Sequence, residues 1–323
     1  MKKRIKTNRA LAVFCCAVTL TACDGGRQDV SSPETSGSAP GMDATGLVNQ
    51  VADRYYASAL EHSPEIAYFA GVELPRHDGL QDNSPAARAA RDAALDEMLA
   101  ELGAVSPDDL IGKTEWITHA YLLQSLQSEV AVRVCRNDLW NVNQMGGWHS
   151  GYMQIAGLQP VGTPGLREQS LSRWSKLPGY VDQEIANLEK GLGAGYSAPK
   201  PVVQRVIDQV DGMLDLEIEA SPFFSPAERD GDPEFIEATR VLVSEQINPA
   251  LKRYRDFLAD TYMERARDEL SVTANPDGLE CYEASLRRYT TLDRSGKEVY
   301  ELGETTVAAN REAVIELGRA AYD

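Results

Sequence analysis

Hydrophobic residues recur at helical spacing along almost the whole chain from Met42 onward, and this periodicity constrains the fold more than any other feature. The first apolar stripe consists of Leu47, Val51, Tyr55 and Leu60. No stretch alternates apolar and polar residues between hairpin turns, and no repeat appears at the periods typical of solenoids. The sequence therefore predicts the all-α fold class, as an irregular multi-helix bundle of about ten helices.

Proline and glycine divide this periodic region into helices. Helix starts are predicted at Ser84-Pro85, Ser106-Pro107, Thr163-Pro164 and Lys200-Pro201. The segment from Ser106 to Asp109 resembles a capping box and predicts a long helix that ends near Val134. Further helices are expected at 166–177, 180–192, 235–267, 280–289, 296–302 and 304–322, with stops at Gly191, Gly193 and Gly195 and a kink or boundary at Pro249. Residues 137–164 are expected to form an irregular loop, because glycine and asparagine break the pattern there.

The N-terminus has the pattern of an export signal. Five basic residues up to Arg9 precede an apolar run from Leu11 to Leu20, which is too short to span a bilayer as a lasting helix. The run ends in Leu20-Thr21-Ala22-Cys23, which resembles the lipobox of bacterial lipoproteins. This resemblance implies that residues 1–22 are a lipoprotein signal peptide, and that Cys23 becomes the first mature residue and carries lipid, palmitate included. The alternative is an ordinary secretory peptide that happens to end in cysteine.

The rest of the domain organisation follows from composition. Residues 23–42 are rich in glycine, serine and proline without periodicity, which predicts a flexible tether. Residues 43–323 are expected to form one α-helical domain. We therefore expect a protein of the bacterial cell envelope that faces the periplasm and is anchored to a membrane through the lipid on Cys23.

The charge balance argues against a nucleic-acid partner. The chain has 32 Lys and Arg against 49 Asp and Glu, and removal of the leader's five basic residues leaves 27 against 49, a net charge of −22. Such a surface repels phosphate backbones and anionic lipid headgroups. The lipid, and not a basic patch, would have to hold this protein to a membrane.

Two cysteines remain once the leader and the lipid acceptor are set aside. Cys135 is expected to end one helix and Cys281 to open another. An even pair in an oxidising compartment favours a disulfide, and the alternative is two buried free thiols.

The histidines give no metal-binding pattern. The chain has four, at positions 62, 77, 119 and 149, and none lies in a His-Glu-x-x-His pair. Glu115 and His119 share one helix face, but two ligands do not make a zinc site, and a partly exposed helix pair explains them better. A nucleophile elbow and a Walker A loop are also absent from the sequence.

One glycine-rich segment is a candidate ligand-binding loop. In Gly146-Gly147-Trp148-His149-Ser150-Gly151, the glycines would let a ligand approach the backbone while Trp148 and His149 line a cleft. The alternative is a loop whose tryptophan fills the helical core.

Several short motifs in a fixed order resemble a bacterial family known as domain of unknown function 885. They are Pro276-Asp277-Gly278 leading into a tyrosine-containing helix, Arg287-Arg288-Tyr289-Thr290-Thr291 at its end, and the segment from Gly296 to Leu302-Gly303. Leu177-Pro178-Gly179-Tyr180 and the stop from Gly191 to Pro201 also match, and Asn143 to Gly146 matches more loosely. The resemblance covers most of residues 45–323 and marks Arg287, Arg288 and Tyr289 as possible ligand contacts. The alternative is that they end the helix and pack, which explains them equally well.

The resemblance implies a longer protein than this chain. Full-length relatives look like exported zinc metallopeptidases of helical zincin type, whose His-Glu-Ala-x-Pro-Gly-His motif lies well downstream of the Tyr-Thr-Thr segment. The present chain ends at Asp323, before that motif would begin. We therefore expect the helical, non-metal, N-terminal portion of such a protein, with no zinc, no other cofactor and no catalytic residue of its own.

Three interpretations of the function follow. The first is a lipid-anchored, peptidase-like protein that is inactive alone, with a peptide substrate or the missing C-terminal half as its partner. The second is a standalone lipoprotein that binds peptides or an envelope partner without catalysis. The third is a structural lipoprotein without a ligand.

Overall fold

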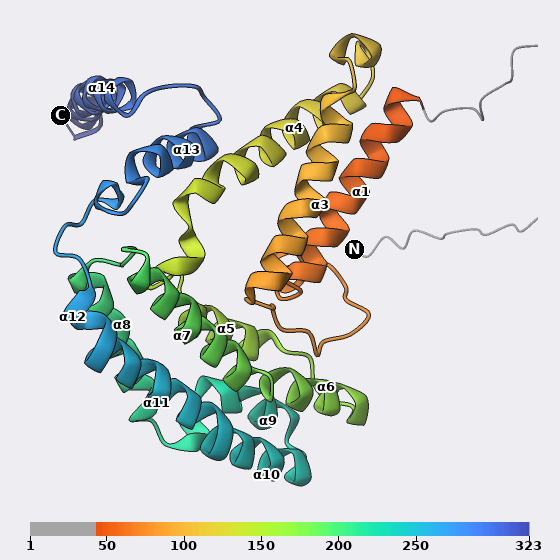
Figure 1. Ribbon diagram of the computed structural model, residues 1–323, viewed down its shortest axis with the longest axis vertical. Helices are drawn as coiled ribbons and strands as arrows, with labels where there is room; N and C mark the ends of the chain where they lie inside the picture. The colour runs from red at the N-terminus through yellow and green to blue at the C-terminus, as the bar shows by residue number, and fades with distance from the viewer. Residues whose placement is uncertain (1–42, 323) are drawn as a thin grey trace, which may run out of the picture. The chain divides into compact units, whose positions relative to one another are not determined.

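The computed structural model describes residues 43–322, and within them the chain is α-helical and has no strand. This confirms the predicted all-α fold class. The only bridge between extended residues in this part joins Pro199 to Arg267. The α-helices are α1 (Ala44–His62), α2 (Ile66–Ala70), α3 (Pro85–Gly103), α4 (Glu115–Ala131), α5 (Trp148–Leu158), α6 (Pro164–Trp174), α7 (Leu177–Gly193), α8 (Lys200–Leu214), α9 (Ser225–Asp230), α10 (Pro233–Leu242), α11 (Asn248–Phe257), α12 (Met263–Arg265), α13 (Gly278–Thr290) and α14 (Gly296–Tyr322). Figure 1 shows their arrangement.

The predicted signal peptide, the tether and Cys23 lie outside the described residues. Within residues 43–322, no helix is long and apolar enough to cross a membrane.

Capping side chains begin several helices where the sequence predicts a start. The Ser84 hydroxyl accepts a hydrogen bond from the Ala87 amide at 3.2 Å, and the Thr163 hydroxyl accepts one from the Leu166 amide at 3.3 Å. In both helices proline follows as the first helical residue, where its missing N–H has no intrahelical partner to lose.

The capping box predicted at Ser106 is wrong. Pro107 to Leu110 form only the 3-10 turn η1, and the Ser106 side chain makes no capping hydrogen bond. Gly112 then adopts a left-handed backbone conformation with φ of 79°, which a continuing α-helix does not allow. Helix α4 therefore begins at Glu115 and passes into the 3-10 turn η2 (Val132–Cys135).

The loop predicted for residues 137–164 is also wrong in part. It contains the 3-10 turn η3 (Asn137–Leu139) and helix α5, which opens at Trp148. Five of the eleven residues of α5 are buried, so tertiary packing overrides the low helix propensity of its glycines.

One predicted helix break is absent, and another lies elsewhere. Gly303 does not interrupt α14, which runs unbroken from Gly296. Helices α6 and α7 separate at Ser175-Lys176, and Pro178 lies in the first turn of α7, where proline is tolerated. Between α10 and α11 lies the π-turn η6 (Val243–Ile247), directly before the boundary predicted at Pro249. A second π-turn, η7 (Leu258–Tyr262), joins α11 to α12.

The apolar stripes pack into two main cores. Helices α1, α3 and α4 lie side by side and bury a core that includes Val51, Leu95 and Leu126. A larger core lies among α5, α6, α7, α8, α10 and α11. Trp174, Leu188, Val206 and Tyr254 are buried in it.

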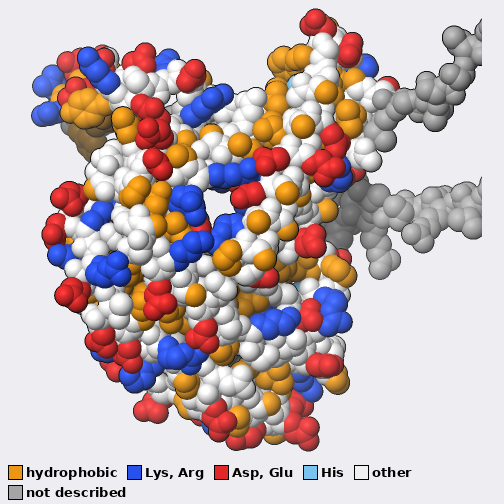
Figure 2. All heavy atoms as spheres, in the orientation of Figure 1, with side chains coloured by type: hydrophobic (Ala, Val, Ile, Leu, Met, Phe, Trp, Pro, Cys, Tyr) orange, Lys and Arg blue, Asp and Glu red, His pale blue; other side chains and the backbone are white. Residues whose placement is uncertain are grey.

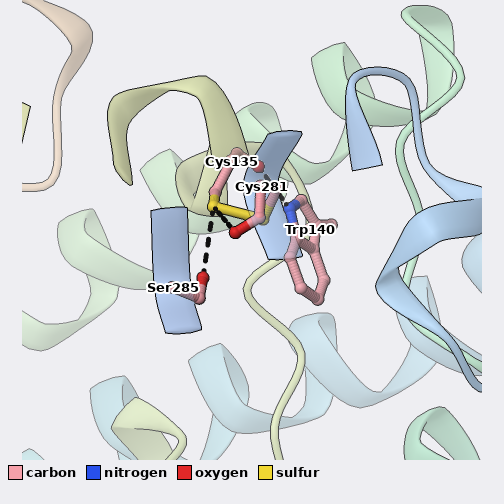
Figure 3. Close-up of a disulfide and its surroundings, with 4 residues drawn as sticks. All are labelled: Cys135, Trp140, Cys281 and Ser285. Carbon is pink, nitrogen blue, oxygen red and sulfur yellow. Dashed lines mark hydrogen bonds between the residues drawn. A yellow bond between two sulfur atoms is a disulfide. The ribbon is translucent and has the colours of Figure 1, made fainter. Parts of the chain in front are cut away.

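Helix α13 is attached to the rest of the domain by a disulfide. Cys135 at the end of η2 is bonded to Cys281 in α13, with the two Cα atoms 4.6 Å apart, and this is the predicted pair. Figure 3 shows the Trp140 indole N–H donating to the Cys135 carbonyl oxygen at 2.9 Å, and the Ser285 hydroxyl 3.6 Å from the Cys135 sulfur. Both cysteines are buried, so the bond is shielded from solvent.

Helix α14 contacts the rest of the domain mainly through α13 and buries none of its residues. Its exposed apolar side chains include Tyr300, Val307, Val314 and Leu317.

Candidate functional site: an arginine-lined cleft

A cleft of about 560 Å³ lies between the α3–α4 pair and helix α7, and α13 contributes to its wall. It is the hollow near the centre of Figure 2, where Lys and Arg side chains gather around the opening. Its lining is largely polar, with arginines and the side-chain amides of Gln81, Asn83, Asn137 and Asn141.

Several arginines of this cleft lie close to one another and share few carboxylates. Arg91 and Arg288 share a single carboxylate, Glu129, at 3.2 and 2.7 Å. Arg88 pairs with Asp138 at 3.3 Å. The exposed Arg136 has no ion pair with any described residue, although it lines the same cleft. Four guanidinium groups therefore lie around these two carboxylates. The rest of the lining adds Arg133, Lys190, Asp82, Asp92 and Glu184, so basic groups outnumber acidic ones by six to five although the chain as a whole is acidic.

A buried carboxyl group forms the floor. Glu184 of α7 is 3% exposed and accepts hydrogen bonds from the Asn83 and Asn141 side-chain amides, each at 2.9 Å. Burial raises the pKa of Glu184, and the two amide hydrogen bonds lower it by a smaller amount. Because burial disfavours the ionised form, Glu184 offsets less of the arginine charge than an exposed glutamate would.

A smaller pocket of about 220 Å³ adjoins the cleft and shares Gln81, Asn141 and Tyr180 with it. Aromatic rings and glycines line most of its wall.

The candidate pair Trp148 and His149 lies in the first turn of α5 and not in a loop. Trp148 is 7% exposed, lines the smaller pocket and packs on Tyr180 and Tyr254, with ring centroids 5.8 and 5.0 Å apart. His149 lines neither the smaller pocket nor the arginine cleft. Its Nε2 lies 2.9 Å from the Gln209 amide oxygen, and burial lowers its pKa, so the neutral ring donates this bond.

The three candidate ligand contacts on α13 lie in different environments. Arg288 lines the arginine cleft, whereas Arg287 is exposed and Tyr289 is 85% exposed. Of the five residues predicted as ligand contacts, the structure places Arg288 at the cleft and Trp148 at the neighbouring pocket, and does not bring the other three to either.

The zinc ion that the family resemblance implies does not fit the residues present. Among residues 43–322, no three His, Cys, Asp or Glu side chains gather to hold a metal ion. His119 is buried, in contrast to the partly exposed pair predicted, and its Nε2 lies 3.1 Å from the Leu102 carbonyl oxygen. His77 bonds to Tyr68, and His62 accepts from Gln81. No hydrolytic step is assigned to this chain.

Sequence reasoning missed most of the cleft. Its arginines lie on α3, in the turn after η2 and on α13, and nothing in their spacing indicates that they meet. The family resemblance identified Arg288, and Asn141 lies close to another segment that the resemblance covers.

The structure shows an all-α domain with a polar cleft, and comparison with known proteins places it in a family. The chain belongs to the family described as "Bacterial protein of unknown function (DUF885)", whose profile matches residues 64–322. A crystal structure described as "the putative lipoprotein from Colwellia psychrerythraea" has a similar fold, with a TM-score of 0.71 at 13% identity. The similarity covers 83% of this chain and 50% of that chain, so the present chain spans about half the length of the Colwellia protein. No curated protein matches the chain.

Proposed function

We propose that this protein is a lipid-anchored, envelope-located member of the family that binds peptides in the arginine-lined cleft. The observation that carries the proposal is the group of five arginines and one lysine in a cleft of about 560 Å³, against five carboxyl groups of which one, Glu184, has its pKa raised by burial. Guanidinium groups bind carboxylates through paired N–H donors, so the cleft is suited to the C-terminal carboxylate of a peptide.

The remaining lining suits a peptide backbone. Asn83, Asn137 and Asn141 carry side-chain amides, which both donate and accept hydrogen bonds as peptide groups do. The volume lies within the range of clefts that bind small organic ligands.

The lipid anchor is proposed from the sequence. Leu20-Thr21-Ala22-Cys23 matches the lipobox, and the Colwellia structure with the similar fold is itself described as a lipoprotein. Three acyl chains on one cysteine would anchor the chain firmly, since each buried CH₂ contributes about 0.8 kcal/mol.

Peptide hydrolysis is proposed only for a longer protein. The resemblance implies a zinc-bearing C-terminal half in full-length relatives, and the exposed apolar side chains of α14 favour such a half as their cover. Sequencing the DNA beyond the Asp323 codon tests this. An in-frame His-Glu-x-x-x-x-His motif supports a divided peptidase, and a firm terminator supports the standalone binder.

Calorimetric titration of the full exported chain tests peptide binding. The probe is an unstructured tetrapeptide with a free C-terminus, and the control is the same peptide amidated at that end. We expect the free carboxylate to improve affinity by about tenfold or more, as for a hydrogen-bonded charge. Equal affinity for the two peptides would refute carboxylate recognition.

A further inference from the structure

Four aromatic side chains line the smaller pocket next to the arginine cleft. Phe69, Trp148, Tyr152 and Tyr180 contribute rings to its wall. The Tyr152 and Tyr180 ring centroids lie 5.2 Å apart, and those of Trp148 and Tyr180 lie 5.8 Å apart. Several ring faces or edges thus border a space of about 220 Å³, and the faces of such rings carry negative potential.

Two polar groups in this pocket lack partners in the part of the chain that the structure describes. The Oε2 atom of Glu65 and the hydroxyl of Tyr152 are buried, and neither has a hydrogen-bond partner there. Tyr152 as a whole is only 4% exposed. Leaving such groups unsatisfied is costly, so their presence in a pocket points to a ligand that supplies donors.

We propose that this aromatic pocket binds a primary ammonium group of a peptide, from a lysine side chain or the N-terminus. An ammonium has three N–H donors and no acceptor, which matches a carboxylate oxygen and a hydroxyl oxygen that both lack donors. The surrounding rings add cation–π attraction. The inference rests on the proposed function, because Gln81, Asn141 and Tyr180 border both spaces and connect the ammonium pocket to the carboxylate cleft.

The charge on Glu65 is set by opposing effects. Burial raises its pKa overall, whereas a backbone hydrogen bond and, to a smaller extent, the nearby Arg173 lower it. Arg173 does not bond to Glu65. Its guanidinium donates to the Tyr68 hydroxyl, the Gln159 amide oxygen and the Gly79 carbonyl oxygen, each at 2.7 Å. No described residue donates a hydrogen bond to the Glu65 Oε2 atom.

Helix α5 leaves room for the ligand stem. Gly151 lines the pocket, and a Cβ atom added there would meet no atom within 4 Å. A side chain introduced at Gly151 would therefore begin in open space next to the pocket. Gly157 lies on the same helix, is equally open and does not line the pocket, which makes it a matched control.

The test compares two tetrapeptides with free C-termini that differ only by lysine or norleucine at one position. Each is titrated with and without N-acetylation, so that side-chain and N-terminal ammonium groups are distinguished. The variants are Glu65→Gln and Gly151→Leu, with Glu61→Gln and Gly157→Leu as controls. Glu61 is exposed at the end of α1 and lines neither space.

We expect the wild type to bind at least one ammonium-bearing peptide about tenfold more tightly than its neutral counterpart. For a lysine side chain the neutral counterpart is the norleucine peptide, and for a free N-terminus it is the acetylated peptide. Glu65→Gln and Gly151→Leu should each reduce that preference to about twofold or less, and both controls should keep it. If the wild type binds all peptides equally, the ammonium pocket is wrong and peptide binding stands. If both variants keep the preference for the ammonium-bearing peptide, the assignment of this pocket as an ammonium site is also wrong. If no peptide binds, the proposed function fails and this inference with it.

Discussion

Glu184 illustrates how burial at a single residue sets a dependence on pH. Its folded-state pKa is raised by burial, so it contributes most to stability when protonated, below its unfolded pKa of about 4.5. That contribution is lost as the pH rises through the folded value. The same reasoning applies to Glu65, whose pKa is raised for the same reason.

The first prediction concerns the Glu184→Gln variant. The free energy of unfolding of the wild type, relative to this variant, should fall as the pH rises from about 4 to about 8. Mismatched amide contacts of the new glutamine with Asn83 and Asn141 add an offset that does not depend on pH. Denaturant unfolding of both proteins across this range measures the difference. A difference that stays constant with pH would show that Glu184 ionises normally.

The second prediction concerns Gly191. The sequence indicates a helix stop there, but the structure gives a different reason for the glycine. A Cβ at Gly191 would lie 1.7 Å from the Leu139 carbonyl oxygen, because α7 and η3 are in backbone contact. Gly191→Ala should therefore destabilise the protein by about 3 kcal/mol or more. Gly179→Ala, at an open position of the same helix, should cost nothing or add up to about 1 kcal/mol. Thermal unfolding compares the two, and equal midpoints would exclude the close approach.

At the scale of helices, the sequence predicts best where local chemistry decides the conformation. Ser84-Pro85 and Thr163-Pro164 begin helices because a hydroxyl and a proline suffice for a start. Ser106-Pro107 has the same local pattern and yields only a 3-10 turn, because Gly112 interrupts five residues further on. Local sequence patterns do not predict helix α5. Burial of Trp148, Tyr152 and Ile155 against other helices offsets the low helix propensity of its glycines.

The third prediction concerns the disulfide that attaches α13. Its cysteines are 146 residues apart, and for a closed loop of this length the chain-entropy model gives about 4–5 kcal/mol as an upper value. The Cys135→Ala, Cys281→Ala double variant should lose a large part of this stability. It should also weaken peptide binding, because α13 carries Arg288 into the cleft. Non-reducing peptide mapping checks the bond itself, and two alkylatable thiols in the native exported protein would rule it out.

At the scale of the whole molecule, the fold class was predictable and the site was not. Helical periodicity and the absence of strand patterns are properties of the sequence alone. The cleft, in contrast, brings Arg88, Arg136 and Arg288 together, and these residues are separated by 200 positions from first to last. Only tertiary packing determines that they meet.

The fourth prediction concerns the anchor. Replacement of Cys23 by serine should release the exported protein from membranes into the soluble fraction, because the acidic mature chain has little attraction for anionic headgroups. Fractionation in the absence of detergent measures this. A Cys23→Ser protein that stays bound through repeated washes would exclude the lipid as the anchor.

The most direct test of the central claim is the affinity of Arg136→Gln for the tetrapeptide with a free C-terminus. Arg136 lines the cleft without an ion pair of its own, so its loss removes a ligand contact and leaves the described ion pairs intact. We predict an affinity about tenfold weaker than that of the wild type, and no change for the amidated peptide. Arg253→Gln, which removes an exposed arginine outside the cleft, should bind both peptides as the wild type does. Unchanged affinity of Arg136→Gln for the free carboxylate would contradict the account.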